Sequence, residues 1–308
     1  MNEFELIQRY LVQPNPPESV RVGNGDDCAV FAVNPGYELC ISIDATIAGR
    51  HVPLVTPGAL FAERALRRAL SDLAACGATP KYLLISLTSD DFEPTWIGHF
   101  GETVHRFCAD WQMTLLGGDL SRGPTAAHIT VLGEVPAGQA IRRGGARAGD
   151  QIVFFGPDCG GARAYLEVLA GHQDVALWQA RYWYPEPQIR CGLQLRGQAT
   201  ACIDVSDGLL QDLQHLLEAA SEPLRAALSG AHVPLCAGLV EAFGRDQALQ
   251  MALTGGDDYG LLATLPDQHP MIAQGHWLGQ LTSADSPHIE LDGELLSGPE
   301  WAGWDHSR

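Results

Sequence analysis

Basic side chains are scarce in this chain of 308 residues. Lysine and arginine together number 19, against 37 aspartates and glutamates, and the formal charge is −18. A nucleic-acid partner is not expected, because binding to a phosphate backbone is driven by lysine and arginine. The surplus of carboxylates suits a protein that gathers cations, although solubility alone explains it almost as well.

Long apolar runs are also missing. No stretch approaches the roughly 20 apolar residues that span a bilayer, and the N-terminal MNEFELIQRYLV lacks the basic-then-apolar pattern of a signal peptide. We therefore expect a cytoplasmic protein without a membrane partner. The eight cysteines form no C-x-x-C pair, so zinc ligation and a disulfide framework are poor interpretations. Buried free thiols are the expected state.

The hydrophobic content of 46% is enough for one large domain or two ordinary ones. Strands and helices alternate in both halves, and a Gly- and Arg-rich stretch without periodicity separates them at 136–150. We place the domain boundary in this stretch, between an N-terminal domain at 1–138 and a C-terminal domain at 139–308. The expected fold class is α/β followed by α+β.

Hydrophobic periodicity predicts the individual elements. Helices are expected at 5–13, after a Thr56 cap and up to Gly77, at 96–111, at 160–170 and at 206–220. Strands are expected at 38–46, 81–91, 113–119, 127–135, 151–156, 200–205 and 261–265. The first strand alternates Leu39, Ile41 and Ile43 as its buried side and ends at Asp44, while residues 247–253 fit either helix or strand.

Five short acidic clusters follow the ends of predicted elements. They are GDD at 25–27, SID at 42–44 with Asp72 at the end of the next helix, GGD at 117–119, DVSDG at 204–208 and GGDD at 255–258. Any one of them alone is an ordinary turn, since Asn, Gly and Asp are common turn residues. Five such clusters among apolar segments favour a composite site for metal and phosphate.

The chemistry of these clusters indicates magnesium. Carboxylates that converge without basic partners suppress each other's ionisation, and bound cations reverse that effect. Oxygen ligands without His or Cys suit Mg²⁺, which binds through a few carboxylates plus substrate phosphates. Ser206 is placed to cap a helix whose N–H groups attract an anion. No calcium-binding loop, Walker A sequence or kinase glycine loop is present, so a nucleotide enzyme must use another scaffold.

One family matches essentially the whole chain, through VGNGDDCAV, SIDATIAGRH, ALSDLAACGATP, LLGGDLSRGP, IRRGGARAGD, IDVSDGLLQDL, LTGGDDYG and WAGWDH in this order. The chain resembles the thiamine-monophosphate kinases, which belong to the ATP-binding superfamily that includes aminoimidazole ribonucleotide synthetase. The resemblance implies that superfamily's two-domain fold, with ATP and Mg²⁺ on the N-terminal domain and an α+β domain that completes the nucleotide and substrate sites. It also implies a homodimer whose N-terminal strands pair across the interface.

The reaction implied by the resemblance is phosphorylation of thiamine monophosphate by ATP, the last step of thiamine diphosphate biosynthesis. The resemblance also implies that the phosphoryl group passes directly between the two substrates with the help of several Mg²⁺ ions. Carried over by position, the implied magnesium set is Asp27, Ser42, Ile43, Asp44, Asp72, Asp119, Asp204 and Asp207, with Asp44, Asp72 and Asp119 as the catalytic group. The implied ATP contacts are Gly117, Gly118, Arg143 and Ser206, and the implied substrate contacts are His51, Asp257 and Trp304.

The chain departs from the family pattern at two places. Relatives carry Ser or Thr where this chain has Ile43, so only a backbone carbonyl ligand survives there. Relatives typically read GGEDYEL where this chain reads GGDDYGL, so Asp257 reaches one methylene less far and Gly260 replaces a second Glu. A backbone shift, a bridging water or an altered substrate affinity is the expected consequence.

Plainer interpretations exist for several of these residues. A lone Trp304 in a polar tail is ordinarily a hydrophobic plug, and a lone His51 is ordinarily a surface residue. The resemblance favours ligand contacts for both, with the tryptophan stacked on the thiazolium or the aminopyrimidine. Asp26, Asp212 and Asp258 are interpreted as structural acids.

Two other functions remain open at this point. The first keeps the fold but changes the chemistry, to a selenophosphate synthetase or a hydrogenase-maturation dehydratase. The former needs a reactive Cys with a Lys near the N-terminus, but no Lys precedes Lys81, and the latter depends on a C-terminal Cys where this chain ends WDHSR. The second is a non-catalytic module whose acidic clusters hold structural cations, which predicts metal-dependent stability without ATP turnover.

Overall fold

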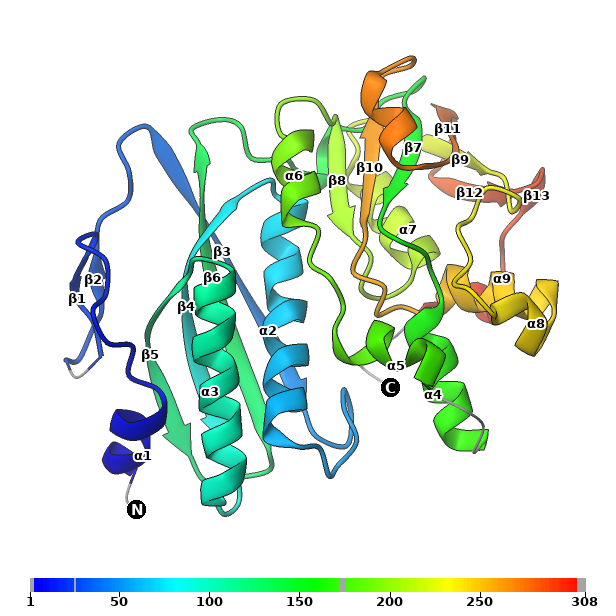
Figure 1. The fold of residues 1–308 in the computed structure, drawn as a ribbon. Coiled ribbons are helices and arrows are strands. Elements are labelled where there is room, and N and C mark those ends of the chain that lie inside the picture. Colours follow the sequence, from blue (N-terminus) through cyan, green and yellow to red (C-terminus); the bar gives the residue numbers. More distant parts are fainter. Residues whose placement is uncertain (1–2, 25, 172–175, 304–308) are drawn as a thin grey trace. The chain divides into compact units, whose positions relative to one another are not determined.

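A computed structural model describes residues 3–24, 26–171 and 176–303 (Figure 1). The chain divides into two compact units. The first unit consists of Met1–Leu73 and Ala78–Gly138, and the second consists of Ala74–Gly77 and Gln139–Arg308. Among the described residues, no helix is both long and apolar enough to cross a membrane.

The first unit is built on a four-stranded sheet in the order β3-β6-β4-β5. The bounds of its strands are Tyr37–Ile47 for β3, Thr79–Thr88 for β4, Thr114–Ser121 for β5 and Ala126–Pro136 for β6. Only β4 and β5 run parallel, and the helix α3 (Pro94–Asp110) connects them, as a parallel pair requires. The helices α2 (Gly58–Ala75) and α3 cover one face of this sheet (Figure 1).

Two smaller features complete the first unit. The helix α1 (Glu3–Tyr10) packs on α3, where the Tyr10 backbone lies 2.5 Å from the position that a Cβ on Gly101 would take. The strands β1 (Val20–Val22) and β2 (Val30–Phe31) form a separate antiparallel pair, and the GDD cluster lies between them.

The orientation of β3 contradicts the sequence-based expectation. Ile41 and Ile43 are 61% and 64% exposed, while Ser42 and Asp44 contact side chains of α2. The strand also continues past Asp44 to Ile47. The prediction of a strand is therefore right, and Leu39 is partly buried against a small apolar cluster that includes Tyr82, but the predicted burial is wrong at Ile41 and Ile43. The reason is that α2 offers polar partners to Ser42 and Asp44, so the polar side of the strand faces the helix.

The second unit is built on a seven-stranded sheet in the order β13-β12-β9-β11-β7-β10-β8, in which only β12 and β9 pair in parallel. Its strands are β7 (Gln151–Phe155), β8 (Ala201–Asp204), β9 (Leu224–Leu228), β10 (Leu261–Leu265), β11 (His276–Ser283), β12 (His288–Leu291) and β13 (Glu294–Leu295). Its helices are α4 (Gly161–Gly171), α5 (Ala176–Trp183), α6 (Ile189–Leu195), α7 (Leu209–Ala219), α8 (Leu239–Phe243) and α9 (Arg245–Thr254). Short 3₁₀ turns lie at η1 (Arg143–Gly145), η2 (Pro270–Gln274) and η3 (Pro299–Trp301).

The helix α7 anchors the core of the second unit. Leu209, Leu213 and Leu216 are fully buried and belong to one cluster with the sheet residues Ile203 and Leu262. Each such side chain contributes about 1.5–3 kcal/mol by leaving water. This packing fixes the N-terminus of α7, and therefore the DVSDG loop before it, against the ends of β8 and β10.

Candidate functional site

In the first unit, Ser42 and Asp72 form one element of the candidate site. The Ser42 hydroxyl donates to Asp72 Oδ2 over 2.5 Å, from β3 to the last turn of α2. A carboxylate at this end of a helix is disfavoured by the helix dipole by about 0.3–1 kcal/mol. The hydroxyl donor offsets part of that cost and aims the carboxylate at the β3 side of the helix.

Asp44 lies two residues along on the same side of β3, and it has a basic partner. Arg68 on α2 places Nε 3.4 Å from Asp44 Oδ2 and Nη2 3.4 Å from Asp44 Oδ1, while its Nη1 donates to Thr46 over 3.1 Å. The Arg68 side chain is only 8% exposed and the Asp44 side chain 26%. The expectation that the acids converge without basic partners is therefore wrong at Asp44. Periodicity did not reveal this pair because it does not say which arginine of α2 faces β3.

His51 lies just beyond β3 and is held by its backbone surroundings. Its Nδ1 accepts the Ile47 N–H over 3.0 Å, and its carbonyl oxygen accepts from Nε of the buried Arg64 over 3.3 Å. A neutral ring that accepts at Nδ1 carries its proton on Nε2. The structure thus fixes both the ring and its tautomer.

In the GDD cluster, Asp26 and Asp27 lie in a bend of the chain. The Asp27 N–H donates to Asp26 Oδ1 over 2.8 Å, and both side chains are exposed. Asp26 has the structural role assigned to it from the sequence, since an Asp side chain often bonds the neighbouring backbone in turns. Asp27 is left with its carboxylate at the surface of the first unit.

The GGD cluster lies on β5, at the opposite edge of the sheet from β3. Gly118 is level with Ile85 on β4, whose carbonyl oxygen is 1.8 Å from the position of a Cβ at 118, so only glycine fits there. Asp119 accepts from the Ser121 hydroxyl over 2.8 Å. Two strands lie between Asp44 and Asp119, which puts the two backbones about 14 Å apart. Within the first unit, the structure does not bring Asp119 to the Ser42–Asp72 pair.

In the second unit, the DVSDG loop is organised around Asp212. The backbone N–H groups of Ser206, Asp207 and Gly208 all donate to Asp212 Oδ2, over 2.9, 3.0 and 3.2 Å. The prediction that Ser206 caps this helix is wrong, because α7 begins at Leu209 with Gly208 as its cap, and a carboxylate of the chain itself occupies the N–H groups of residues 206–208 in this conformation. Burial, and then the nearby Asp207 charge, raise the pKa of Asp212 to about 7 against the lowering effect of the three hydrogen bonds.

Asp212 is thus a structural acid, but it shapes the loop that carries two predicted site residues. The Asp212 side chain is 3% exposed. The signal for this role was its position one turn inside a helix that begins after Ser-Asp-Gly, where carboxylates bond free N–H groups. Asp204 ends the preceding strand β8 and is 4% exposed, so it lies at the same end of the sheet as this loop.

The GGDD cluster lies beside the DVSDG loop. The Asp257 N–H donates to the Ser206 carbonyl over 2.8 Å, and the Tyr259 hydroxyl donates to Asp257 Oδ1 over 2.8 Å. Asp257 and Tyr259 have positive φ values of 61° and 51°, a conformation that costs non-glycine residues energy. Ser206, Asp207 and Asp257 are therefore brought together in the second unit.

Asp258 lies between Asp257 and Tyr259 and ties this segment to the residues before α4. Its Oδ1 accepts the Gly160 N–H over 2.9 Å, and complete burial raises the pKa of Asp258 well above its ordinary value. Asp158 and Asp257 raise the pKa further, while Arg181, which pairs with Asp158 over 2.6 Å, lowers it. Asp258 is structural, as interpreted from the sequence.

The remaining predicted residues make fewer contacts that bear on their predicted roles. Arg143 is exposed in η1, beside β8, where the Arg142 carbonyl accepts the Cys202 N–H over 3.1 Å. Ile43 points away from α2 and offers no side-chain ligand atom. Trp304 lies outside the described residues. Gly117 precedes Gly118 on β5.

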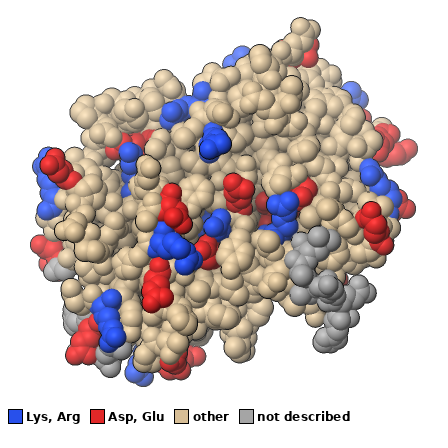
Figure 2. Space-filling view, viewed as in Figure 1, with Lys and Arg blue, Asp and Glu red and all other residues tan. Residues whose placement is uncertain are grey.

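The oxygen donors of the site suit a Mg²⁺ ion that the protein shares with bound phosphates. Among the described residues, no three His, Cys, Asp or Glu side chains form a metal-binding group by themselves. Mg²⁺ is ordinarily held by one or two carboxylates together with substrate phosphates and water, so paired oxygen donors such as Ser42 and Asp72 suit it. On the face drawn in Figure 2, the coloured basic side chains stand singly or beside acids and form no continuous basic surface.

Comparison with known proteins gives concordant matches. Residues 25–135 match the family model described as AIR synthase related protein, N-terminal domain. The thiamine-monophosphate kinase of Escherichia coli strain K12 is 36% identical over 322 residues, which cover 99% of this chain and 98% of the relative.

Two solved structures are also similar. The crystal structure of thiamine-monophosphate kinase from Stenotrophomonas maltophilia K279a matches with a TM-score of 0.84 and 29% identity over 95% of this chain and 96% of that one. The protein AaThiL, complexed with AMPPCP and TMP, matches with a TM-score of 0.79 and 26% identity over 89% of each chain. The fold class expected from the resemblance, an aminoimidazole ribonucleotide synthetase-like arrangement of mixed sheets, is confirmed. Identity above one third over nearly the whole length of both chains shows that this protein belongs to the thiamine-monophosphate kinase family.

Proposed function

We propose that this protein transfers the γ-phosphoryl group of ATP to thiamine monophosphate and releases thiamine diphosphate and ADP. The observation that carries the proposal is the likeness, over 89% of each chain, to a protein that binds an ATP analogue and TMP together. The dehydratase alternative is supported only by structures of hydrogenase maturation protein HypE at 16% identity, a likeness that shows a shared fold alone.

We assign the predicted magnesium residues to Mg²⁺ held between protein and phosphates. The oxygen donors that fit are Ser42, Asp44 and Asp72 in the first unit and Asp204 and Asp207 in the second, with Asp27 and Asp119 as further members of the predicted set. When bound, Mg²⁺ neutralises the charge that accumulates between the two reacting phosphate groups. Ile43 contributes at most its backbone carbonyl oxygen.

The side chains of the chain itself supply positioning. The acceptor phosphate is already ionised, so the reaction demands no strong general base, and its loose transition state needs alignment and charge neutralisation. Asp212 holds the loop of Ser206 and Asp207 in one conformation, and Tyr259 does the same for the Asp257 carboxylate. The exposed Arg143 guanidinium is suited to bind phosphate oxygens in a bidentate manner.

The homodimer is part of the proposal. Tyr37, Ile41 and Ile43 of the edge strand β3 are 44%, 61% and 64% exposed. Exposed apolar side chains on an edge strand are a liability unless another chain covers them. In a homodimer, a second copy of the chain that covers this side of β3 would remove the exposed apolar side chains from water.

The test of the function is a turnover assay of the purified chain with ATP, Mg²⁺ and thiamine monophosphate. The product is oxidised to its fluorescent thiochrome and separated by chromatography. Thiamine diphosphate that forms with the wild-type chain, and no longer forms with EDTA, supports the proposal. If the chain binds ATP in a Mg²⁺-dependent way but forms no thiamine diphosphate, the substrate assignment is overturned. Attention then turns to Asp257, where the family carries the longer Glu.

A further inference from the structure

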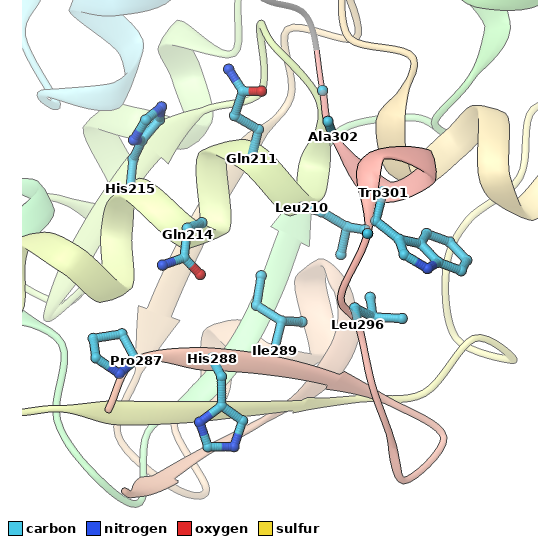
Figure 3. A pocket seen from close by; sticks show the side chains of 12 residues that line it. Leu210, Gln211, Gln214, His215, Pro287, His288, Ile289, Leu296, Trp301 and Ala302 are labelled. Carbon is cyan, nitrogen blue, oxygen red and sulfur yellow. The ribbon is translucent and has the colours of Figure 1, made fainter. Parts of the chain in front are cut away.

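Two buried acids lie next to the strained part of the GGDD segment in the second unit. Asp258 stands between Asp257 and Tyr259, whose φ values of 61° and 51° are unfavourable for non-glycine residues. Such backbone persists only where its surroundings hold it, so the contacts of the Asp258 side chain influence the position of the Asp257 carboxylate. Neither Asp258 nor the nearby Asp158 lines the pocket of about 350 Å³ beside α7 (Figure 3), so both act on the chain and not on a molecule in that pocket.

Each of these two acids has one oxygen in use and one without a partner. Asp258 Oδ1 accepts the Gly160 N–H over 2.9 Å, and Asp158 Oδ2 lies 2.6 Å from Arg181 Nη2 on α5. Asp258 Oδ2 and Asp158 Oδ1 are buried, and within residues 3–24, 26–171 and 176–303 neither has a hydrogen-bond partner. A buried oxygen without a partner is costly, so two such oxygens in neighbouring acids require a physical explanation.

A proton shared by the two carboxyl groups satisfies both oxygens. Burial is the largest cause that raises the pKa of Asp258, and the two groups are close enough for the Asp158 charge to raise it further. A protonated carboxyl group carries an O–H donor, and two carboxyl groups at a shared site retain one proton between them. Because Arg181 compensates the charge of Asp158, the proton belongs on Asp258 Oδ2, which donates it to Asp158 Oδ1 directly or through one water.

The groups that face the pair from neighbouring segments do not remove this proton. Arg181 lowers the pKa of Asp258 and Asp257 raises it, while burial outweighs both. The thiols of Cys159 and Cys236 are neutral at physiological pH, because burial raises the pKa of Cys159 well above its ordinary value and that of Cys236 to about 11. The charge balance around Asp258 therefore favours its protonated form.

We propose that Asp158 and Asp258 share a proton, and that this carboxyl pair, anchored by Arg181, positions Asp257 for the thiamine substrate. The inference rests on the proposed function and adds three positioning residues to it, which act through Asp257. The bond between the pair ties the strained segment to the residues before α4. Without it the backbone of the segment relaxes, the Asp257 carboxylate moves, and thiamine monophosphate binds more weakly.

Two substitutions of Asp258 test the shared proton. Asp258→Asn keeps an oxygen for the Gly160 N–H, and its amide N–H takes the place of the O–H that donates to Asp158, whereas Asp258→Leu has a similar shape and keeps neither. The KM for thiamine monophosphate is expected within about twofold of the wild type for Asp258→Asn and about tenfold or more higher for Asp258→Leu, with kcat and the KM for ATP within about twofold in both. An Asp258→Asn enzyme whose KM rises as far as that of Asp258→Leu overturns the shared proton, because the charge of Asp258 would then be what matters.

Arg181 tests the anchor, and it replaces Asp258→Leu if that variant melts well below the wild type. Arg181→Met is expected to raise the KM for thiamine monophosphate about threefold or more, and Arg181→Lys, which retains a charge for Asp158, should lie closer to the wild type. Arg225→Met is the matched control, since Arg225 is 39% exposed against 40% for Arg181 and pairs with Glu290 over 3.5 Å. An unchanged KM in both Asp258→Leu and Arg181→Met overturns the positioning role.

Infrared difference spectroscopy of the wild type against Asp258→Asn gives a readout that needs no turnover. At neutral pH the carbonyl stretching band of a protonated carboxyl group is expected in the wild type and is expected to be missing from the variant. A difference spectrum with carboxylate bands alone overturns this inference and leaves the proposed function intact. A wild type that shows the band but does not convert thiamine monophosphate overturns the proposed function, and with it the positioning role.

Discussion

At the scale of single residues, the sequence identified many acids of the candidate site but not their partners. Asp44 and Asp72 were found because acids at element ends stand out among apolar segments. Arg68 and Asp212 were not assigned to the site, because each acts through a contact that only the tertiary structure creates. A pattern along one helix shows which residues share a side, but it does not show which side faces a given strand.

Arg68 gives the first prediction. A buried guanidinium beside Asp44 repels a metal ion at the same carboxylate, so Arg68→Met is expected to lower the Mg²⁺ concentration for half-maximal activity severalfold. The same change is expected to lower the free energy of unfolding by about 1–3 kcal/mol, because the partly buried Asp44 loses its partner. A Mg²⁺ titration of turnover and chemical denaturation measure the two effects.

Arg67→Met is the control for Arg68. Arg67 is on the same helix but pairs with Glu63 over 2.8 Å, so its loss should leave the Mg²⁺ dependence unchanged. An Arg68→Met enzyme that needs more Mg²⁺ than the wild type would contradict the repulsion argument and indicate that Arg68 orients Asp44 for the metal.

Asp258 gives a prediction about pH. Its pKa in the folded chain is raised above the ordinary value of 3.8, so the folded state holds this proton to higher pH than the unfolded state does. Stability from this group is therefore present at low pH and is lost as the pH rises from about 4 through the raised pKa. Asp258→Asn keeps an oxygen acceptor for the Gly160 N–H and cannot titrate.

Thermal melts at a series of pH values measure this effect. The melting temperature of the wild type is expected to fall relative to that of Asp258→Asn as the pH rises above 4. Parallel curves for the two proteins would show that Asp258 does not hold its proton in the folded chain.

At the scale of elements, helices with a clear apolar stripe were predictable and short strands were not. The helices α2 and α7 appear close to their expected positions, and residues 247–253 resolve as part of the helix α9. The strand β11 was not predicted, since Gly279 and exposed polar residues interrupt its pattern. Its glycine is required by close pairing, because a Cβ there would lie 1.9 Å from the Ala227 carbonyl oxygen of β9.

The N-terminus of α7 gives a prediction at this scale. Asp212→Ala leaves the N–H groups of Ser206, Asp207 and Gly208 without their acceptor, and is expected to cost roughly 2–4 kcal/mol of unfolding free energy. Turnover is expected to fall by tenfold or more, because Asp207 loses its fixed position. Asp212→Asn, which retains an oxygen acceptor, should lie between the wild type and the alanine variant. Denaturation and steady-state kinetics of both variants, with Glu218→Ala on the exposed side of α7 as control, measure these effects.

At the scale of the whole molecule, the exposed apolar side of β3 in the first unit is relevant to the oligomeric state. Leu39, Ile41 and Ile43 were expected to face the core, yet Ile41 and Ile43 are exposed. Alternation predicts that one side of a strand is apolar, but it cannot distinguish a core within one chain from a surface that a second chain covers. The exposed pair is what the proposed homodimer explains.

Ile43→Glu tests the dimer. A buried charge on the proposed interface is expected to convert the dimer to a monomer, measured by light scattering at micromolar concentration. Val55→Glu is the control, since Val55 is 90% exposed in the loop after β3 and is not on the sheet. A wild type that is already monomeric, or an Ile43→Glu variant that remains dimeric, would contradict an interface at β3.

The central claim is direct phosphoryl transfer from ATP to thiamine monophosphate by this chain. Phosphorus NMR of the purified protein with ATP, thiamine monophosphate and Mg²⁺ tests it most directly, because it follows every phosphate at once. The account predicts that thiamine diphosphate and ADP appear in equal amounts, without inorganic phosphate, and that both cease to form with Asp44→Asn. ADP that accumulates with inorganic phosphate while thiamine monophosphate stays unchanged would contradict it.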